Sequence, residues 1–187
     1  IVKCLHQVDG CQLLGLGQDW KYERQGLVSL KRIVEALRGL QLPAKDLLSF
    51  QRWVMFNYLI GNSDAHAKNI SVLIDETGYA LAPFYDLLCV QVYGDDRLAL
   101  YIGDEDQYAS IGAHSWEAFC EDCGFSVKST MTLFRKMAQD VAKAWATVTA
   151  QATVDFALSR PELGLIQSIT MVIETNCSAA LSMTTKR

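Results

Sequence analysis

The chain has 187 residues, half of them hydrophobic, and a formal net charge of -4 at pH 7. This length can bury one sizeable core and no proline- or serine-rich linker divides it, so we expect a single domain over residues 1–187. No lysine or arginine run is longer than a pair such as the terminal Lys186-Arg187, which argues against direct nucleic-acid binding by this chain alone. No apolar stretch is long enough to span a bilayer, and we expect a cytoplasmic protein without membrane contact.

Apolar periodicity predicts mostly helices with one small β region in the middle, a mainly α (α+β) fold. A first helical stripe runs from Leu27 to Leu37 and is closed by Gly39. A second helix is predicted from about Lys45 to Ile60. It ends at Gly61 and delivers the chain to the loop 62–69.

A β-hairpin is predicted next. Ile70–Ile74 and Tyr79–Ala82 are the strand candidates, and Asp75–Gly78 has strong turn chemistry. Asn69 precedes the first strand and Asp86 follows the second, so we expect the hairpin to bring both side chains to the same end.

The remainder contains one more extended segment, Leu98–Ile102, and three helices. Ser115 is expected to cap a short helix that ends at Cys123. A long amphipathic helix begins near Ser129, and a last one follows Arg160-Pro161, where proline suits a helix start.

The six cysteines are scattered through apolar segments of a chain too large to need disulfides, so we expect reduced thiols. Cys120 and Cys123 form a C-x-x-C motif, which can be a redox pair or half of a zinc site. No second such pair exists, and Trp116 and Phe119 share their helical face. The pattern favours buried core thiols.

The most informative run is Gly61–Asn69, followed by Phe84–Leu88. Asp64 stands five residues before Asn69, and Asp86 lies downstream. Kinases use such a set to place a proton acceptor and two metal ligands around a transferring phosphate. Asn69 and Asp86 could supply oxygen ligands to magnesium, and Asp64 could accept the hydrogen bond of a substrate hydroxyl.

These residues also have plainer interpretations. Asn62-Ser63-Asp64 is typical of turns and helix caps. Asp86 is harder to explain in that way, because large apolar residues flank it and a carboxylate in such a frame needs a cation or hydrogen bonds. His66 could orient the loop, contact phosphate or be a core histidine, and Lys68 could neutralise phosphate or lie in solvent.

The segments Asn57–Asn69 and Leu81–Leu88 resemble the catalytic core of HipA-like serine/threonine protein kinases, the toxins of bacterial toxin-antitoxin pairs. Leu5–Gly15 and Leu98–Gly103 agree with the same family. The D-x-H-x-x-N core is also similar to that of phosphoinositide lipid kinases. The resemblance implies a helical kinase C-terminal lobe with a small central β-hairpin that carries the catalytic and metal-binding loops.

By this resemblance Asp64 is the catalytic aspartate, Asn69 and Asp86 hold Mg²⁺, and ATP is the phosphoryl donor. The residues that it assigns to nucleotide binding are Gln7, His66, Lys68 and Tyr85. It also implies a protein substrate, with aminoacyl-tRNA synthetases among the family's targets, and a small HipB-like antitoxin as partner.

A kinase also needs a glycine-rich loop and a lysine from an N-terminal lobe. In HipA-like proteins that lobe precedes the His-Gln-x-Asp motif, which here starts at His6. Gly10, Gly15 and Gly17 follow no clear strand and are interpreted as helix-end glycines. We therefore expect the C-terminal lobe of a kinase, with half of an ATP cleft and little or no activity alone.

Two other classes of function stay open. An interaction module, in which the helical lobe docks an antitoxin or another subunit, predicts binding that survives loss of Asp64 and Asp86. A metal-dependent phosphoesterase would use Asp64, His66 and Asp86 as ligands around a bound water, and predicts hydrolysis without ATP.

Overall fold

The computed structural model describes residues 5–76 and 78–184, and within them the fold is mainly helical. Its α-helices are α1 (Gly10–Leu13), α2 (Leu30–Gly39), α3 (Ala44–Ile60), α4 (Ala113–Cys123), α5 (Val127–Asp155) and α6 (Arg160–Ser182). Its strands are β1 (His6–Asp9), β2 (Ser71–Asp75), β3 (Gly78–Leu81), β4 (Arg97–Ile102) and β5 (Glu105–Gln107). Cys4, Thr77 of the predicted turn and Lys186-Arg187 lie outside the described residues.

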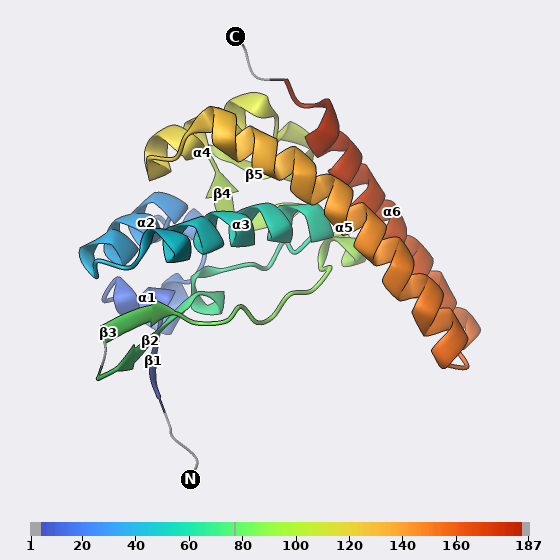
Figure 1. Cartoon of the computed structure of the whole chain (residues 1–187), viewed down its shortest axis with the longest axis horizontal. Helices are drawn as coiled ribbons and strands as arrows, with labels where there is room; N and C mark the ends of the chain where they lie inside the picture. The colour runs from blue at the N-terminus through green and yellow to red at the C-terminus, as the bar shows by residue number, and fades with distance from the viewer. Residues whose placement is uncertain (1–4, 77, 185–187) are drawn as a thin grey trace.

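Helix α3 crosses the middle of the molecule, with α5 and α6 on one side and the three-stranded sheet on the other (Figure 1). The buried apolar side chains form one continuous cluster. Its centre is aromatic, and the Trp116 ring of α4 lies 4.3 Å from that of Phe134 in α5 and 5.7 Å from that of Tyr58 in α3. This packing fixes the end of α3, after which the loop 62–69 with the predicted catalytic residue Asp64 begins.

The predicted hairpin is confirmed as β2 and β3, which pair antiparallel with Val72 opposite Leu81. The sheet has a third strand, β1, that the sequence did not predict. It pairs antiparallel with β2 and places Asp9 opposite Ser71. This strand has only four residues, and the first two are exposed, so apolar and polar residues do not alternate clearly along it. The sequence pattern therefore did not reveal the strand.

Strand β1 corrects the interpretation of Gly10, because this glycine follows a strand directly and opens α1. A Cβ atom at Gly10 would lie 2.5 Å from the carbonyl oxygen of Ala67. The amide of Gly10 also donates to the carbonyl of Ile70 at 2.8 Å. Gly10 therefore permits a close backbone approach between α1 and the segment that ends at Asn69.

Three predicted helix starts differ from the structure. The first helix begins at Leu30, because the side chain of Ser29 caps it, and Leu27 lies outside it. Helix α4 begins at Ala113, and Ser115 lies in its first turn, where its hydroxyl accepts the Gly112 amide. Helix α5 begins at Val127, and the cap is Ser126. In each case a serine near the true start was misassigned or overlooked, which shifts a boundary without changing the element.

Five cysteines in the described residues are free, and Cys120 and Cys123 are buried in the core as predicted. Burial raises the pKa of the Cys123 thiol to about 12. Over the part of the chain that the structure describes, no helix has the length and apolarity to cross a bilayer.

The substitution Gly10→Ala is expected to destabilise the fold by about 1–3 kcal/mol, because the new methyl group would press on the Ala67 carbonyl and move the backbone around it. Urea unfolding measures the change. Gly17→Ala is the matched control, since Gly17 has a negative φ of -70° and open space around it. Equal midpoints for the two variants would contradict the close approach.

Candidate active site

The loop that carries Asp64 begins where α3 ends at Gly61. Gly61 adopts a left-handed conformation with φ of 74°, and a Cβ atom there would meet Val172 of α6 at 2.5 Å. The Gly61 carbonyl accepts the Gln91 amide at 2.9 Å, and the Ser63 carbonyl accepts the Ala99 amide at 2.8 Å. Backbone hydrogen bonds from two later segments therefore fix the start of the loop.

Asn62 connects this loop to the loop that carries Asp86. Its side-chain amide donates to Asn57 Oδ1 at 2.7 Å and to the Asp86 carbonyl at 2.9 Å. Asn57 in turn donates to the Trp53 carbonyl within α3 at 2.8 Å. Asn57 and Asn62 are both buried, so this amide chain lies in a low-dielectric environment where its hydrogen bonds are strong.

The two predicted metal ligands are in direct contact. Asn69 Nδ2 donates to Asp86 Oδ2 at 2.7 Å, and Asn69 Oδ1 accepts the His66 amide at 2.9 Å. Asp86 has a φ of 59°, a left-handed conformation that is uncommon outside glycine and frequent at functional sites. The hairpin thus brings Asn69 and Asp86 to one end, as the sequence predicted.

The sequence argument for Asp86 was wrong in one respect. Tyr85, Leu87 and Leu88 are 39%, 41% and 56% exposed, and Asp86 itself is exposed. Its carboxylate is not in an apolar frame and does not need a cation to offset burial. What singles it out is the pairing with Asn69 and the strained backbone.

The oxygens of this pair fit a hard divalent cation. Within residues 5–76 and 78–184, no hydrogen bond reaches Asp86 Oδ1. The side-chain oxygen of Asn69 accepts the His66 amide with one lone pair and has a second lone pair available. One carboxylate and one amide oxygen suit Mg²⁺, which retains several waters. By contrast, the described His, Cys, Asp and Glu side chains include no cluster of three that could hold a metal. Asp64, His66 and Asp86 therefore do not form the ligand set of the phosphoesterase alternative.

A polar surface pocket of about 410 Å³ lies beside this pair. All four residues assigned to nucleotide binding contribute to its wall, which is lined by Gln7, Asp9, Gln12, His66, Lys68, Asn69, Ser71 and Tyr85. The pocket thus joins β1, the loop and the end of the hairpin in one cavity.

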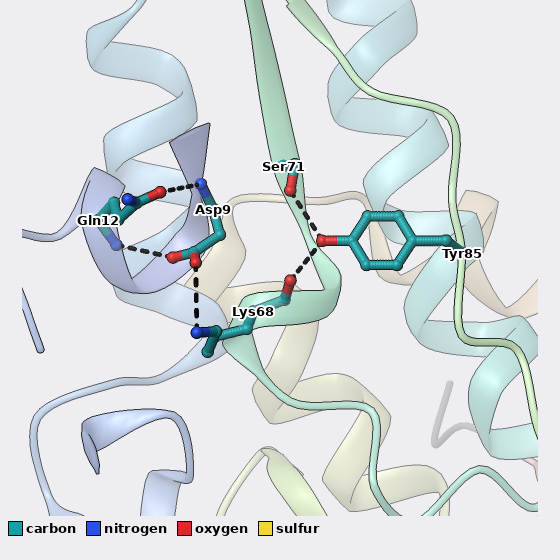
Figure 2. Close-up of polar contacts among 5 residues, drawn as sticks. All are labelled: Asp9, Gln12, Lys68, Ser71 and Tyr85. Atoms are coloured by element: carbon teal, nitrogen blue, oxygen red, sulfur yellow. Dashed lines mark hydrogen bonds and ion pairs between the residues drawn. The ribbon is translucent and has the colours of Figure 1, made fainter. Parts of the chain in front are cut away.

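Two groups of contacts shape the wall of the pocket (Figure 2). The Asp9 carboxylate accepts the backbone amide of Gln12 and so caps α1. It also forms an ion pair with Lys68, with 3.8 Å between Oδ2 and Nζ. The Tyr85 hydroxyl bonds to Ser71 Oγ at 2.9 Å and donates to the Lys68 carbonyl. Lys68 is therefore partly neutralised, and Tyr85 is held by its polar end with its ring partly exposed.

His66 lies in the pocket wall with only 8% of its surface exposed. Its Nδ1 atom is buried and has no hydrogen-bond partner among the described residues. Burial lowers the pKa of the imidazole, and the nearby Lys21 ammonium lowers it further. A neutral ring with an unpaired nitrogen is suited to a polar ligand, although the ring also packs edge-on against Tyr22.

The predicted proton acceptor, Asp64, is half-buried and is not among the residues that line the pocket. Its Oδ1 atom accepts a hydrogen bond of 2.9 Å from the hydroxyl of Tyr22. Tyr22 lies 42 residues earlier in the chain. The sequence reasoning missed it, because no local pattern announces a contact over that distance.

Comparison with known protein families gives a match over most of the chain. Residues 3–145 match the family model described as the HipA-like C-terminal domain.

The chain belongs to this family.

Curated relatives of this HipA-like domain are named as kinases. A Sinorhizobium fredii protein named "Putative kinase Y4mE" is 34% identical over 79% of this chain and 36% of its own length. The "Serine/threonine-protein kinase toxin HipA" of Shewanella oneidensis is 32% identical over 76% of this chain and 36% of its own length. The chain thus spans about a third of the length of these relatives.

A solved structure has the same fold. HipA in a Shewanella oneidensis complex of HipA, HipB and operator DNA superposes on the HipA-like domain with a TM-score of 0.84. The match is 27% identical and covers 93% of this chain and 43% of the solved one. The C-terminal-lobe fold that the sequence predicted is confirmed.

Within this domain, the segment that carries Tyr22 is attached on both sides to other segments of the chain. The Lys21 carbonyl accepts the Ala67 amide at 3.2 Å, and Glu23 Oε2 accepts the Tyr101 amide of β4 at 2.7 Å. Burial raises the pKa of the Glu23 carboxyl to about 7, against the opposing effect of the Tyr101 amide. Glu23 is therefore an anchor that titrates near neutral pH.

Glu23→Gln is expected to change how stability depends on pH. Between pH 4.5 and about 7 the folded chain holds a proton on Glu23 that the unfolded chain has lost, so stability falls as pH rises through this window. Glutamine keeps the acceptor for Tyr101 without the charge. The free energy of unfolding of the variant, relative to that of the unaltered chain, should therefore rise by on the order of 1–3 kcal/mol from pH 4.5 to pH 8.

Urea unfolding at the two pH values measures this gain. Glu35→Gln, on the exposed side of α2, is the control and should follow the unaltered chain. An effect of Glu23→Gln that has the same size at both pH values would show that Glu23 is not the titrating anchor.

Proposed function

We propose that this chain is the C-terminal lobe of an ATP- and Mg²⁺-dependent serine/threonine protein kinase. The observation that carries the proposal is the 2.7 Å contact between Asn69 and Asp86, which joins two loops at the polar pocket that Asn69 lines. Family membership and the kinase names of two relatives support it. Phosphoryl transfer relies mainly on positioning and charge neutralisation, and these residue types supply both.

Each residue then has a distinct role. Asp64 accepts the proton of the substrate hydroxyl and aims its oxygen at the γ-phosphate. Asn69 and Asp86 hold Mg²⁺, which when bound offsets the charge of the phosphates. The ATP-binding residues are Gln7, His66, Lys68 and Tyr85. The Lys68–Asp9 ion pair is long enough, at 3.8 Å, for the ammonium to turn toward a phosphate.

In this proposed kinase, residues 1–187 supply only half of the ATP cleft. Gly10 is packed on Ala67 rather than facing the pocket as part of a phosphate loop. Gly15, just beyond α1, has a φ of 67° that suits a helix end. We propose that a glycine-rich loop and a lysine come from an N-terminal lobe, and that residues 1–187 alone have little or no kinase activity.

The substrate and the partner are proposed from the resemblance to HipA-like kinases. We propose a protein substrate modified on serine or threonine, with an aminoacyl-tRNA synthetase as the candidate target. A HipB-like antitoxin is the proposed partner, supported by the Shewanella HipA structure, which is a complex with HipB and operator DNA.

An interaction module is the second candidate function. The α5–α6 hairpin carries exposed apolar side chains near its turn, including Val154 and Phe156 at 81% and 65% exposure. Such residues are common in protein contacts. This function predicts partner binding that persists when Asp64 and Asp86 are both replaced by alanine.

Asp64→Ala in the full-length gene product should reduce phosphoryl transfer by about 10²–10⁴-fold, because a positioned proton acceptor contributes a factor of that size. Transfer of ³²P from ATP to casein or to the protein itself, with Mg²⁺ present, measures the loss. Asp155→Ala, at the exposed end of α5, is the control and should retain activity. Unchanged transfer by the Asp64 variant, or none by the unaltered protein, would reject the proposed function.

A further inference from the structure

The carboxylate of Asp64 has a single side-chain partner in the described residues. The Tyr22 hydroxyl donates a hydrogen bond to Asp64 Oδ1 at 2.9 Å, and no other side chain of residues 5–76 and 78–184 bonds to this carboxylate. A hydrogen bond to an ionised acceptor is among the stronger kinds. Rotation about the last bond of an aspartate is otherwise broad, so this contact selects one orientation of the carboxylate.

The Tyr22 ring is itself held from several directions. It packs edge-on against His66, with 5.6 Å between centroids and 77° between planes. The Arg24 guanidinium lies 4.1 Å from the ring centroid and the Lys21 ammonium 4.8 Å. The Tyr22 amide donates to Gln25 Oε1 at 3.1 Å, which fixes the backbone beneath the ring.

The segment around Tyr22 is also attached to the rest of the site. Ala67 in the loop donates to the Lys21 carbonyl, and Tyr101 in β4 donates to Glu23. The hydroxyl of Tyr22 is therefore presented to Asp64 from a fixed base. It does not depend on the placement of a free side chain.

We propose that Tyr22 is a positioning residue for phosphoryl transfer. It holds Oδ1 of Asp64, so that Oδ2 faces the substrate hydroxyl and receives its proton. This inference rests on the proposed function, since it assigns a role to a residue that acts through Asp64. It adds a residue outside the D-x-H-x-x-N core, from a segment with no motif of its own.

The same contact could have the opposite effect. A substrate hydroxyl must come within about 2.6–3.2 Å of Asp64 to give up its proton, and the Tyr22 hydroxyl already lies at such a distance from Oδ1. If Tyr22 competed with the substrate for Asp64, its removal would raise the rate. A positioning role requires a fall in the rate, so the sign of the change separates the two.

Tyr22→Phe in the full-length gene product tests the proposal. This substitution removes only the hydroxyl, and the phenyl ring keeps the contacts with His66 and Arg24. We expect kcat for the acceptor protein to fall about ten- to a hundredfold, while KM for ATP and the melting temperature stay unchanged. Tyr93→Phe is the control, because Tyr93 is 75% exposed, and it should leave kcat unaltered.

A second pair of variants tests whether Tyr22 acts through Asp64. In an Asp64→Ala background, Tyr22→Phe should cause no further loss of the residual transfer. An unchanged or increased kcat for Tyr22→Phe alone, or an equal loss in both backgrounds, overturns the inference. If Asp64→Ala reduces transfer as expected and Tyr22→Phe does not slow it, only this inference fails; if Asp64→Ala is fully active, the proposed function fails.

Discussion

The side-chain amide of Asn62 donates to Asn57 in α3 and to the carbonyl of Asp86, and the rest of the site depends on this bridge. It joins the end of a buried helix to a loop whose backbone is in a left-handed conformation at Asp86. A strained residue persists only where its surroundings fix it. Asn62 holds the Asp86 backbone and Asn69 holds its side chain, so the carboxylate has a defined place even though it is exposed.

The site is assembled from segments far apart in sequence, and each is attached by backbone hydrogen bonds. Strand β1 brings Asp9 beside Ser71, while the Tyr22 segment reaches the loop through the Lys21 carbonyl and approaches Asp64 through its hydroxyl. Gly10 makes the approach of α1 possible. This arrangement lets a mainly helical lobe present polar groups at one surface while its aromatic core stays buried.

The local parts of this structure were predictable from sequence. The α3 end at Gly61, the β2–β3 hairpin and the meeting of Asn69 with Asp86 follow from turn and capping chemistry close to each residue. Strand β1 was missed because an edge strand of four residues has no period to detect, and Tyr22 because its partner is 42 residues away. The exposure of Asp86 was misjudged, since apolar neighbours in sequence do not fix burial. The single-domain assignment and the roles of the site residues stay predictions.

The central claim is that Asn69 and Asp86 hold a metal in front of Asp64. A crystal structure of the full-length gene product with Mg²⁺ and a non-hydrolysable ATP analogue tests it most directly. The account predicts Mg²⁺ bound to Asn69 Oδ1 and the Asp86 carboxylate, the nucleotide in the pocket that His66, Lys68 and Tyr85 line, and the γ-phosphate facing Asp64. Nucleotide bound elsewhere, or a metal held by Asp64 instead, would contradict it.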